Sequence, residues 1–111
     1  MISNDPVLNS LIGRLKDYFG DDLDQVILFG SYARGEERAD SDIDLFVVVS
    51  KYEKRDARKK LNELIFEYLL SSQKLFSIII KDKDFLKKWE DTVDLFSEIK
   101  KEGKILYAKA G

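Results

Sequence analysis

A Gly-Ser pair and a closely following pair of aspartates are the residues of this chain best suited to chemistry. Gly30-Ser31 ends one apolar run, and Asp42 and Asp44 open the next, with residues 32–41 between them. Glycine lets a backbone approach a ligand closely, and the free N–H groups at a helix start favour a phosphate. On a strand, Asp42 and Asp44 project from the same face. Two adjacent carboxylates are costly without a cation between them, and Mg²⁺ suits a site of carboxylate and phosphate oxygens.

This pattern resembles the signature of the DNA polymerase β-type nucleotidyltransferase superfamily. The short chain, the Arg34-Gly35 pair and the run from Ser41 to Leu45 are similar to its minimal nucleotidyltransferase branch, which includes the MNT antitoxin partners of HEPN-domain toxins. The competing interpretation is a simple Gly-Ser turn followed by a solvated acidic loop. That interpretation does not explain why the two acids open an apolar strand.

The resemblance implies an activity and a role for each residue. Family members transfer a nucleotide from a nucleoside triphosphate to a hydroxyl group, using two divalent metal ions. By this resemblance, Asp42 and Asp44 are the catalytic residues and bind two Mg²⁺ or Mn²⁺ ions. Gly30 and Ser31 hold the β- and γ-phosphates of ATP, which is the substrate.

The sequence leaves the roles of two further positions undecided. Arg34 is near enough in sequence to bind a phosphate, but it could equally pair with Glu36 or Asp40. Many relatives carry a third carboxylate on the strand after the long helix, which holds the catalytic metal or takes the acceptor's proton. Here Ser77 lies near the expected position, and the closest acid is Asp82. A hydroxyl cannot replace a carboxylate in either role.

Composition limits the alternatives. The 111 residues fit one domain, expected to span residues 1–111, and the absence of Cys and His means that oxygen atoms must hold any metal. A net charge of −2 gives no global basic field, so direct nucleic-acid binding is not expected. No apolar run reaches the roughly 20 residues of a membrane span, and residues 1–10 lack a signal-peptide pattern. A cytoplasmic location is therefore expected.

Hydrophobic periodicity predicts the elements that must position the site. The order helix, strand, short helix, strand, long helix, strand, helices indicates an α/β fold, a single small nucleotidyltransferase palm domain with a mixed sheet and helices mainly on one face. Asp21, Asp22 and Asp24 are interpreted as a solvated acidic turn before the first strand. The predicted elements are a helix capped by Asn4 or Asp5 and ending at Gly20, strand 25–29, a helical turn 31–35, strand 42–49, an amphipathic helix after the charged segment 51–60, strand 75–80, helix 83–89, a helix capped by Thr92 with Val93, Leu95, Phe96 and Ile99 inward and ending at Gly103, and an edge strand 105–107.

The charged segment that opens the long helix is strongly basic. Residues 51–60 contain six cations and two acids, a local charge of +4. This segment could contact RNA or an acidic partner, or it could be an ordinary solvated helix face.

Three functions are compatible with these features. The chain could transfer AMP to a hydroxyl acceptor on a partner protein such as a HEPN-type toxin, and so act as an antitoxin. It could instead be a partner-binding module with a vestigial nucleotide site, or a nucleotide sensor without transfer. The intact Gly-Ser and Asp-x-Asp pattern favours the first, and the missing third acid favours the others. Larger relatives add a helical domain that closes over the substrate, so here a partner chain or self-association would have to supply it.

Overall fold

A four-stranded mixed sheet with the strand order β3-β2-β1-β4 forms the centre of the molecule. The structure is a computed structural model and describes residues 5–110. Strand β1 is antiparallel to both β2 and β4, whereas β2 and β3 are parallel. The elements are α1 (Pro6–Phe19), the 3₁₀ turn η1 (Gly20–Asp22), β1 (Leu23–Phe29), α2 (Ser31–Arg34), β2 (Ile43–Val49), α3 (Lys54–Ser72), β3 (Phe76–Asp82), α4 (Lys83–Trp89), α5 (Asp94–Glu102) and β4 (Lys104–Ala108).

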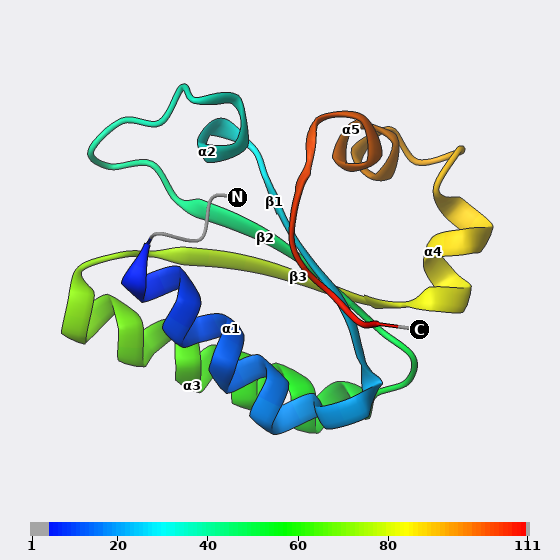
Figure 1. The fold of residues 1–111 in the computed structure, drawn as a ribbon, viewed down its shortest axis with the longest axis horizontal. Coiled ribbons are helices and arrows are strands. Elements are labelled where there is room, and N and C mark those ends of the chain that lie inside the picture. Colours follow the sequence, from blue (N-terminus) through cyan, green and yellow to red (C-terminus); the bar gives the residue numbers. More distant parts are fainter. Residues whose placement is uncertain (1–4, 111) are drawn as a thin grey trace.

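The helices form two layers, one on each face of the sheet (Figure 1). The two long helices, α1 and α3, lie on one face, where they share the larger hydrophobic core with β1 and β2. The shorter α4 and α5 lie on the other face, where Phe96 and Ile99 pack on Ile27 and Phe46. The α/β class and the mixed sheet predicted from the sequence are confirmed. None of the helices between residues 5 and 110 is long and apolar enough to cross a membrane.

Local sequence explains where the first helix begins. The Asp5 side chain accepts hydrogen bonds from the N–H groups of Val7 and Leu8, and Pro6 occupies the first turn. A carboxylate in this position satisfies N–H groups that have no partner within the helix, and proline loses nothing there. Of the two predicted caps, Asp5 is therefore the one observed, and Asn4 lies outside the described residues.

Strand β2 is the most deeply buried element. The five residues from Leu45 to Val49 are each at most 2% exposed, because α1 and α3 cover one face and α4 and α5 the other. This confirms the prediction of a central strand from its continuous apolar run. The strand therefore gives Asp44, which lies near its start, a rigid support.

The structure corrects several details of the sequence interpretation. Strand β1 begins at Leu23, so Asp24 lies within the strand and not in a turn before it. Its carboxylate forms an ion pair with Lys83. Strand β3 continues to Asp82, two residues beyond the predicted end. Val93, not Thr92, is the N-cap of α5, and no side chain caps that helix. Val93 and Leu95 are each 37% exposed, so they do not point inward.

Candidate functional site

The turn between β1 and α2 brings Gly30 and Ser31 to the end of the sheet. Gly30 has φ 74° and ψ −155°, a conformation that side-chain-bearing residues rarely adopt. Its carbonyl accepts hydrogen bonds from the N–H groups of Ala33 (3.1 Å) and Arg34 (3.2 Å), which close the single helical turn that begins at Ser31. The predicted phosphate loop is therefore a tight strand-to-helix turn.

Gly30 lies directly against the carboxylate of Asp44. A Cβ built at Gly30 would collide with Oδ2 of Asp44, and it would lie 3.1 Å from Cγ. Antiparallel pairing of β1 with β2 brings the two residues together, because Phe29 is opposite Asp44. The absence of a side chain at residue 30 thus leaves the space that the carboxylate occupies. The two halves of the sequence motif form one site.

The two aspartates differ in their surroundings. Asp44 is half-buried in β2, whereas Asp42 is exposed and precedes the strand. The pKa of the Asp44 carboxyl is raised, first by burial and then by the negative charge of Asp42, while the Arg34 guanidinium opposes this effect. The carboxylates are therefore close enough to repel each other. The predicted strand start at Asp42 is one residue early.

Arg34 forms ion pairs on the protein surface. Its Nε donates to Oε1 of Glu36 at 2.8 Å, and Nη1 lies 3.7 Å from Oε2 of Glu102. Of the two predicted partners, Glu36 is the observed one and Asp40 is not. No local sequence signal indicates Glu102, because this residue comes from α5, far along the chain. Exposed ion pairs of this kind contribute little to the stability of the fold. Arg34 can therefore exchange them for a phosphate at a low cost in free energy.

Ser77 lies beside Asp44 in the β2–β3 register. The nearest acid along the chain, Asp82, is opposite Val49 at the other end of the sheet. Asp82 follows Ser77 by five residue steps along the strand, a distance of about 17 Å. The Asp82 carboxylate also accepts a hydrogen bond from the Phe85 N–H and so caps α4. Of the two candidates for the position of the third carboxylate, only Ser77 lies next to Asp44.

The residues present fit a divalent cation held jointly with a triphosphate. No cluster of three or more metal-binding His, Cys, Asp or Glu side chains occurs among residues 5–110. Mg²⁺ is typically held by one or two carboxylates together with substrate phosphates and water. Asp42 and Asp44 supply such a pair, and their mutual repulsion would be relieved by a cation. The carboxylate–glycine contact puts the Asp44 carboxylate directly beside the predicted phosphate loop.

A small mixed sheet that joins a glycine turn to a strand-borne aspartate defines a nucleotidyltransferase domain. The chain belongs to the family described as Polymerase beta, Nucleotidyltransferase, whose sequence model matches residues 9–110.

Two proteins of Methanocaldococcus jannaschii are similar in sequence, and both are named provisionally as protein adenylyltransferases. The first, MJ1305, is 41% identical over 71 residues, which are 62% of this chain and 47% of that protein. The second, MJ0141, is 36% identical over 74 residues, 67% of this chain and 75% of that protein. The matched part of this chain thus spans about half the length of the first relative.

Solved structures share the fold at low sequence identity. A mutant of the toxin–antitoxin complex MntA–HpeT aligns with a TM-score of 0.63 and 23% identity, covering 92% of this chain and 72% of that chain. The complex of a tri-AMPylated HEPN toxin from Shewanella oneidensis with its MNT antitoxin aligns with a TM-score of 0.59 and 22% identity, covering 93% and 71%. These likenesses establish the fold of the chain.

Proposed function

We propose that this domain transfers AMP from ATP to a hydroxyl group on a partner protein and depends on Mg²⁺ or Mn²⁺. The observation that carries the proposal is the contact between Gly30 and the carboxylate of Asp44, which joins the Gly-Ser turn to one of the two acids. The provisional names of the two M. jannaschii relatives support the protein acceptor. The matches cover 47% and 75% of those two relatives, so each relative also contains residues outside the matched part.

Each residue of the site has a distinct part in the proposed reaction. The N–H groups at the start of α2 and the Ser31 hydroxyl bind the distal phosphates, while Asp42 and Asp44 hold up to two divalent ions. These ions supply charge stabilisation for the attacking and leaving oxygens. The acceptor oxygen bonds to the α-phosphorus, the bond to pyrophosphate breaks, and the hydroxyl proton passes to solvent. Arg34 can leave Glu36 to bind a phosphate.

The proposed acceptor is a small helical protein of the HEPN type, with this chain as its antitoxin. One solved complex of the same fold contains an AMPylated HEPN toxin bound to its antitoxin, which makes that class of partner the first to test. The direct experiment incubates this protein with α-labelled ATP, Mg²⁺ and a HEPN-type protein with which it forms a complex. Label on the partner, lost in Asp44→Asn, is the expected result. Unlabelled partner in a confirmed complex would contradict the proposal.

A second function follows from the position of Ser77. Because this hydroxyl lies beside Asp44, where relatives carry a third carboxylate, the domain could bind nucleotide or a partner without efficient transfer. Tight binding of Mg·ATP with no labelled product would favour that function. Self-association could then take the place of the helical partner, and sedimentation of the free protein would reveal it.

A further inference from the structure

The solvent-facing side of α3 carries a continuous stripe of side chains with two different halves. Arg55, Lys59, Asn62, Phe66 and Leu70 follow one another at intervals of three or four residues, so they share one face of the helix. The opposite face contributes Ala57, Leu61, Leu64 and Tyr68 to the core. We call the exposed set the α3 stripe. Its first half is basic and its second half is apolar.

The apolar half is strongly exposed. Phe66 is 61% exposed and Leu70 is 69% exposed, the two highest values among the large hydrophobic side chains of the described residues. Their neighbour Leu69 is 39% exposed. Single exposed apolar side chains are common, but contiguous ones mark interaction surfaces.

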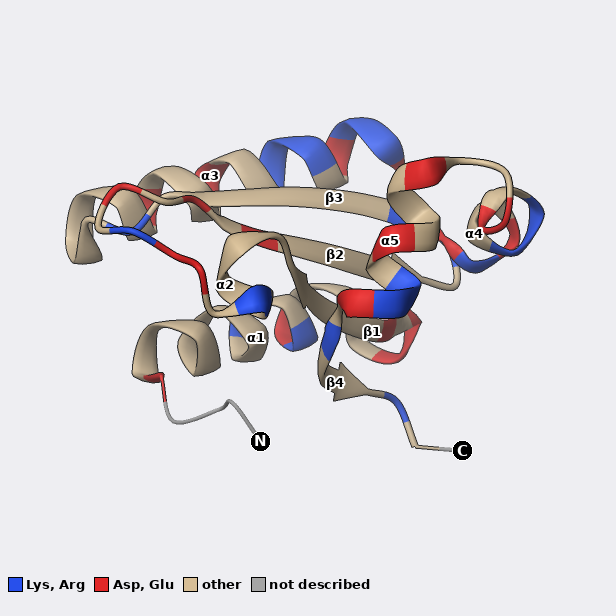
Figure 2. Ribbon diagram, turned by 90° about the horizontal axis from the view of Figure 1, so that it is seen from above, with Lys and Arg blue, Asp and Glu red and all other residues tan. Residues whose placement is uncertain are grey.

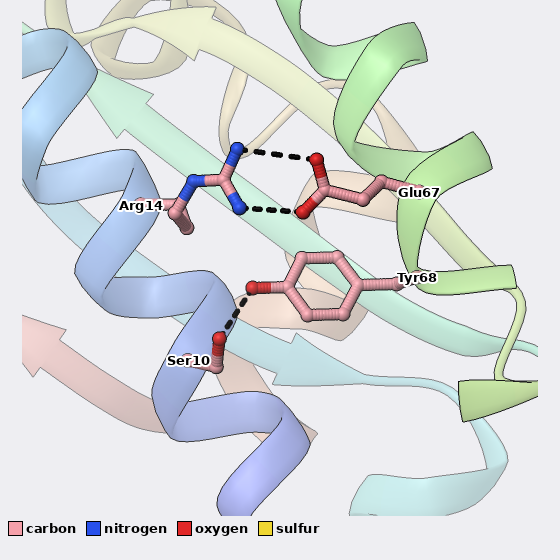
Figure 3. Close-up of polar contacts among 4 residues, drawn as sticks. All are labelled: Ser10, Arg14, Glu67 and Tyr68. Atoms are coloured by element: carbon pink, nitrogen blue, oxygen red, sulfur yellow. Dashed lines mark hydrogen bonds and ion pairs between the residues drawn. The ribbon is translucent and has the colours of Figure 1, made fainter. Parts of the chain in front are cut away.

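Contacts with α1 fix the orientation of this half (Figure 3). Arg14 forms a two-pronged ion pair with Glu67, and the hydroxyl groups of Ser10 and Tyr68 share a hydrogen bond of 2.6 Å. Both contacts hold the residues after Phe66 toward α1. The helix therefore cannot roll to bury Phe66 without breaking them.

The basic half has no intramolecular explanation. Within residues 5–110, no ion pair involves the side chains of Lys54, Arg55, Arg58 or Lys59. Cations near a helix N-terminus oppose the helix dipole, so they do not stabilise α3 itself. Together with Asn62 they line a shallow hollow, and Figure 2 shows the basic residues gathered on the first turns of α3. An acidic partner surface would satisfy these charges.

We propose that the α3 stripe docks a helix of a partner protein that is acidic along one half and apolar along the other. A second copy of this chain fits poorly, since antiparallel pairing over the whole stripe would set Arg55 against Leu70 and Lys59 against Phe66. RNA would satisfy the basic half alone. The inference rests on the protein partner of the proposed function and adds the surface that binds it.

The direction of α3 connects this surface with the nucleotide site. The chain passes from the apolar half of α3 directly to the start of β3, where Ser77 lies beside Asp44. The apolar half therefore lies at the end of the sheet that carries the acidic pair, and the basic half at the opposite end. A partner helix that binds along the α3 stripe therefore brings the rest of the partner protein near the proposed nucleotide site.

The test uses the 111-residue chain and a purified HEPN-type protein from the same organism. Fluorescence anisotropy measures binding of the double variants Phe66→Ser/Leu70→Ser and Arg55→Glu/Lys59→Glu, with circular dichroism as the check on folding. Each is expected to weaken binding by about tenfold or more, as central interface residues do. The charge-reversed variant should also lose the weakening of binding by salt, because its side chains no longer attract an acidic partner through a field that salt screens.

The control variants make the same kinds of substitution at exposed positions outside the α3 stripe. Ile105→Ser removes an exposed apolar side chain from β4, and Lys87→Glu/Lys101→Glu makes the same charge change on α4 and α5. Both should bind like wild type. The inference would be overturned if the stripe variants bind the partner like wild type. It would also be overturned if only Arg55→Glu/Lys59→Glu loses binding and the wild type binds RNA in place of the partner protein.

Transfer measurements separate this inference from the proposed function. The stripe variants should keep Mg·ATP binding but lose AMP transfer to the partner, whereas Asp44→Asn should bind the partner normally and lose transfer. If wild type binds through the stripe without transferring AMP, only the proposed function fails. If wild type forms no complex with the partner, the docking inference is overturned.

Discussion

Replacement of Gly30 by alanine tests the contact on which the candidate site depends. The backbone of Gly30 lies in a region essentially restricted to glycine, and holding another residue there costs about 1–3 kcal/mol. The new Cβ would also collide with Oδ2 of Asp44, and overpacked contacts cost about 1–3 kcal/mol. Asp44 is only half-buried and can move aside in part. We therefore expect Gly30→Ala to lower the free energy of unfolding by about 2–4 kcal/mol.

Thermal unfolding followed by circular dichroism measures this loss. An unfolding entropy of about 2.1 cal/mol/K per residue gives roughly 0.23 kcal/mol/K for 111 residues, so each kcal/mol lowers Tm by about 4 °C. The expected decrease in Tm is about 9–17 °C. Because the displaced carboxylate no longer faces the phosphate turn, the affinity for Mg·ATP measured by titration calorimetry should also fall.

Other glycines separate backbone strain from the collision. Gly35 has φ 71°, but a Cβ there would meet no atom within 4 Å, so Gly35→Ala should show strain alone, about 1–2 kcal/mol. Gly13 lies within α1 with equally open space, and Gly13→Ala should stabilise the protein by about 0.5–1 kcal/mol. The double variant Gly30→Ala/Asp44→Ala should recover the part due to the collision. If Gly30→Ala melts within about 2 °C of Gly35→Ala, or about 0.5 kcal/mol, and binds Mg·ATP normally, the reasoning is refuted.

Three further variants test the site. Asp42→Asn/Asp44→Asn should lose metal-dependent ATP binding in calorimetry while Tm stays the same or rises, because the two carboxylates no longer repel each other; unchanged affinity would show that the metal assignment is wrong. Ser31→Ala should weaken ATP binding by about tenfold and AMP binding less, since we propose that its hydroxyl binds the distal phosphates; equal losses in a competition assay would exclude this role. Ser77→Asp should raise AMP transfer to a validated acceptor and lower the Tm of the metal-free protein, because it adds both a base and a negative charge; a folded, nucleotide-binding variant with reduced transfer would argue against the strand alignment.

The sequence predicted the order of the elements and the position of the motif because both depend on local signals. The continuous apolar run of β2 indicated a strand buried on both faces, and this burial supports Asp44. Gly30 was expected to allow a close backbone approach. The structure adds the identity of one neighbour, the Asp44 carboxylate, which depends on the β1–β2 register.

Features that depend on distant parts of the chain could not be predicted in this way. The ion pair of Arg34 with Glu102 joins α2 to α5, and no local pattern connects them. The inward positions of α5 were assigned by apolar character alone, so Val93 and Leu95 were misplaced although Phe96 and Ile99 were correct. The packing of α4 and α5 determines which of these apolar residues is covered.

The position of β1 between neighbours that lie at different distances along the chain has a consequence for folding kinetics. Its pairing with β2 closes a short loop after Phe29, whereas its pairing with β4 joins Leu28 to Lys104. The longer loop costs about 1.5 kcal/mol more to close, so we expect the β1–β2 pair, with the nucleotide turn, to form first. Until β4 adds, the apolar strand β1 has an open edge that could pair with another chain. The later step, which protects this molecule from aggregation, is thus separate from the step that builds its site.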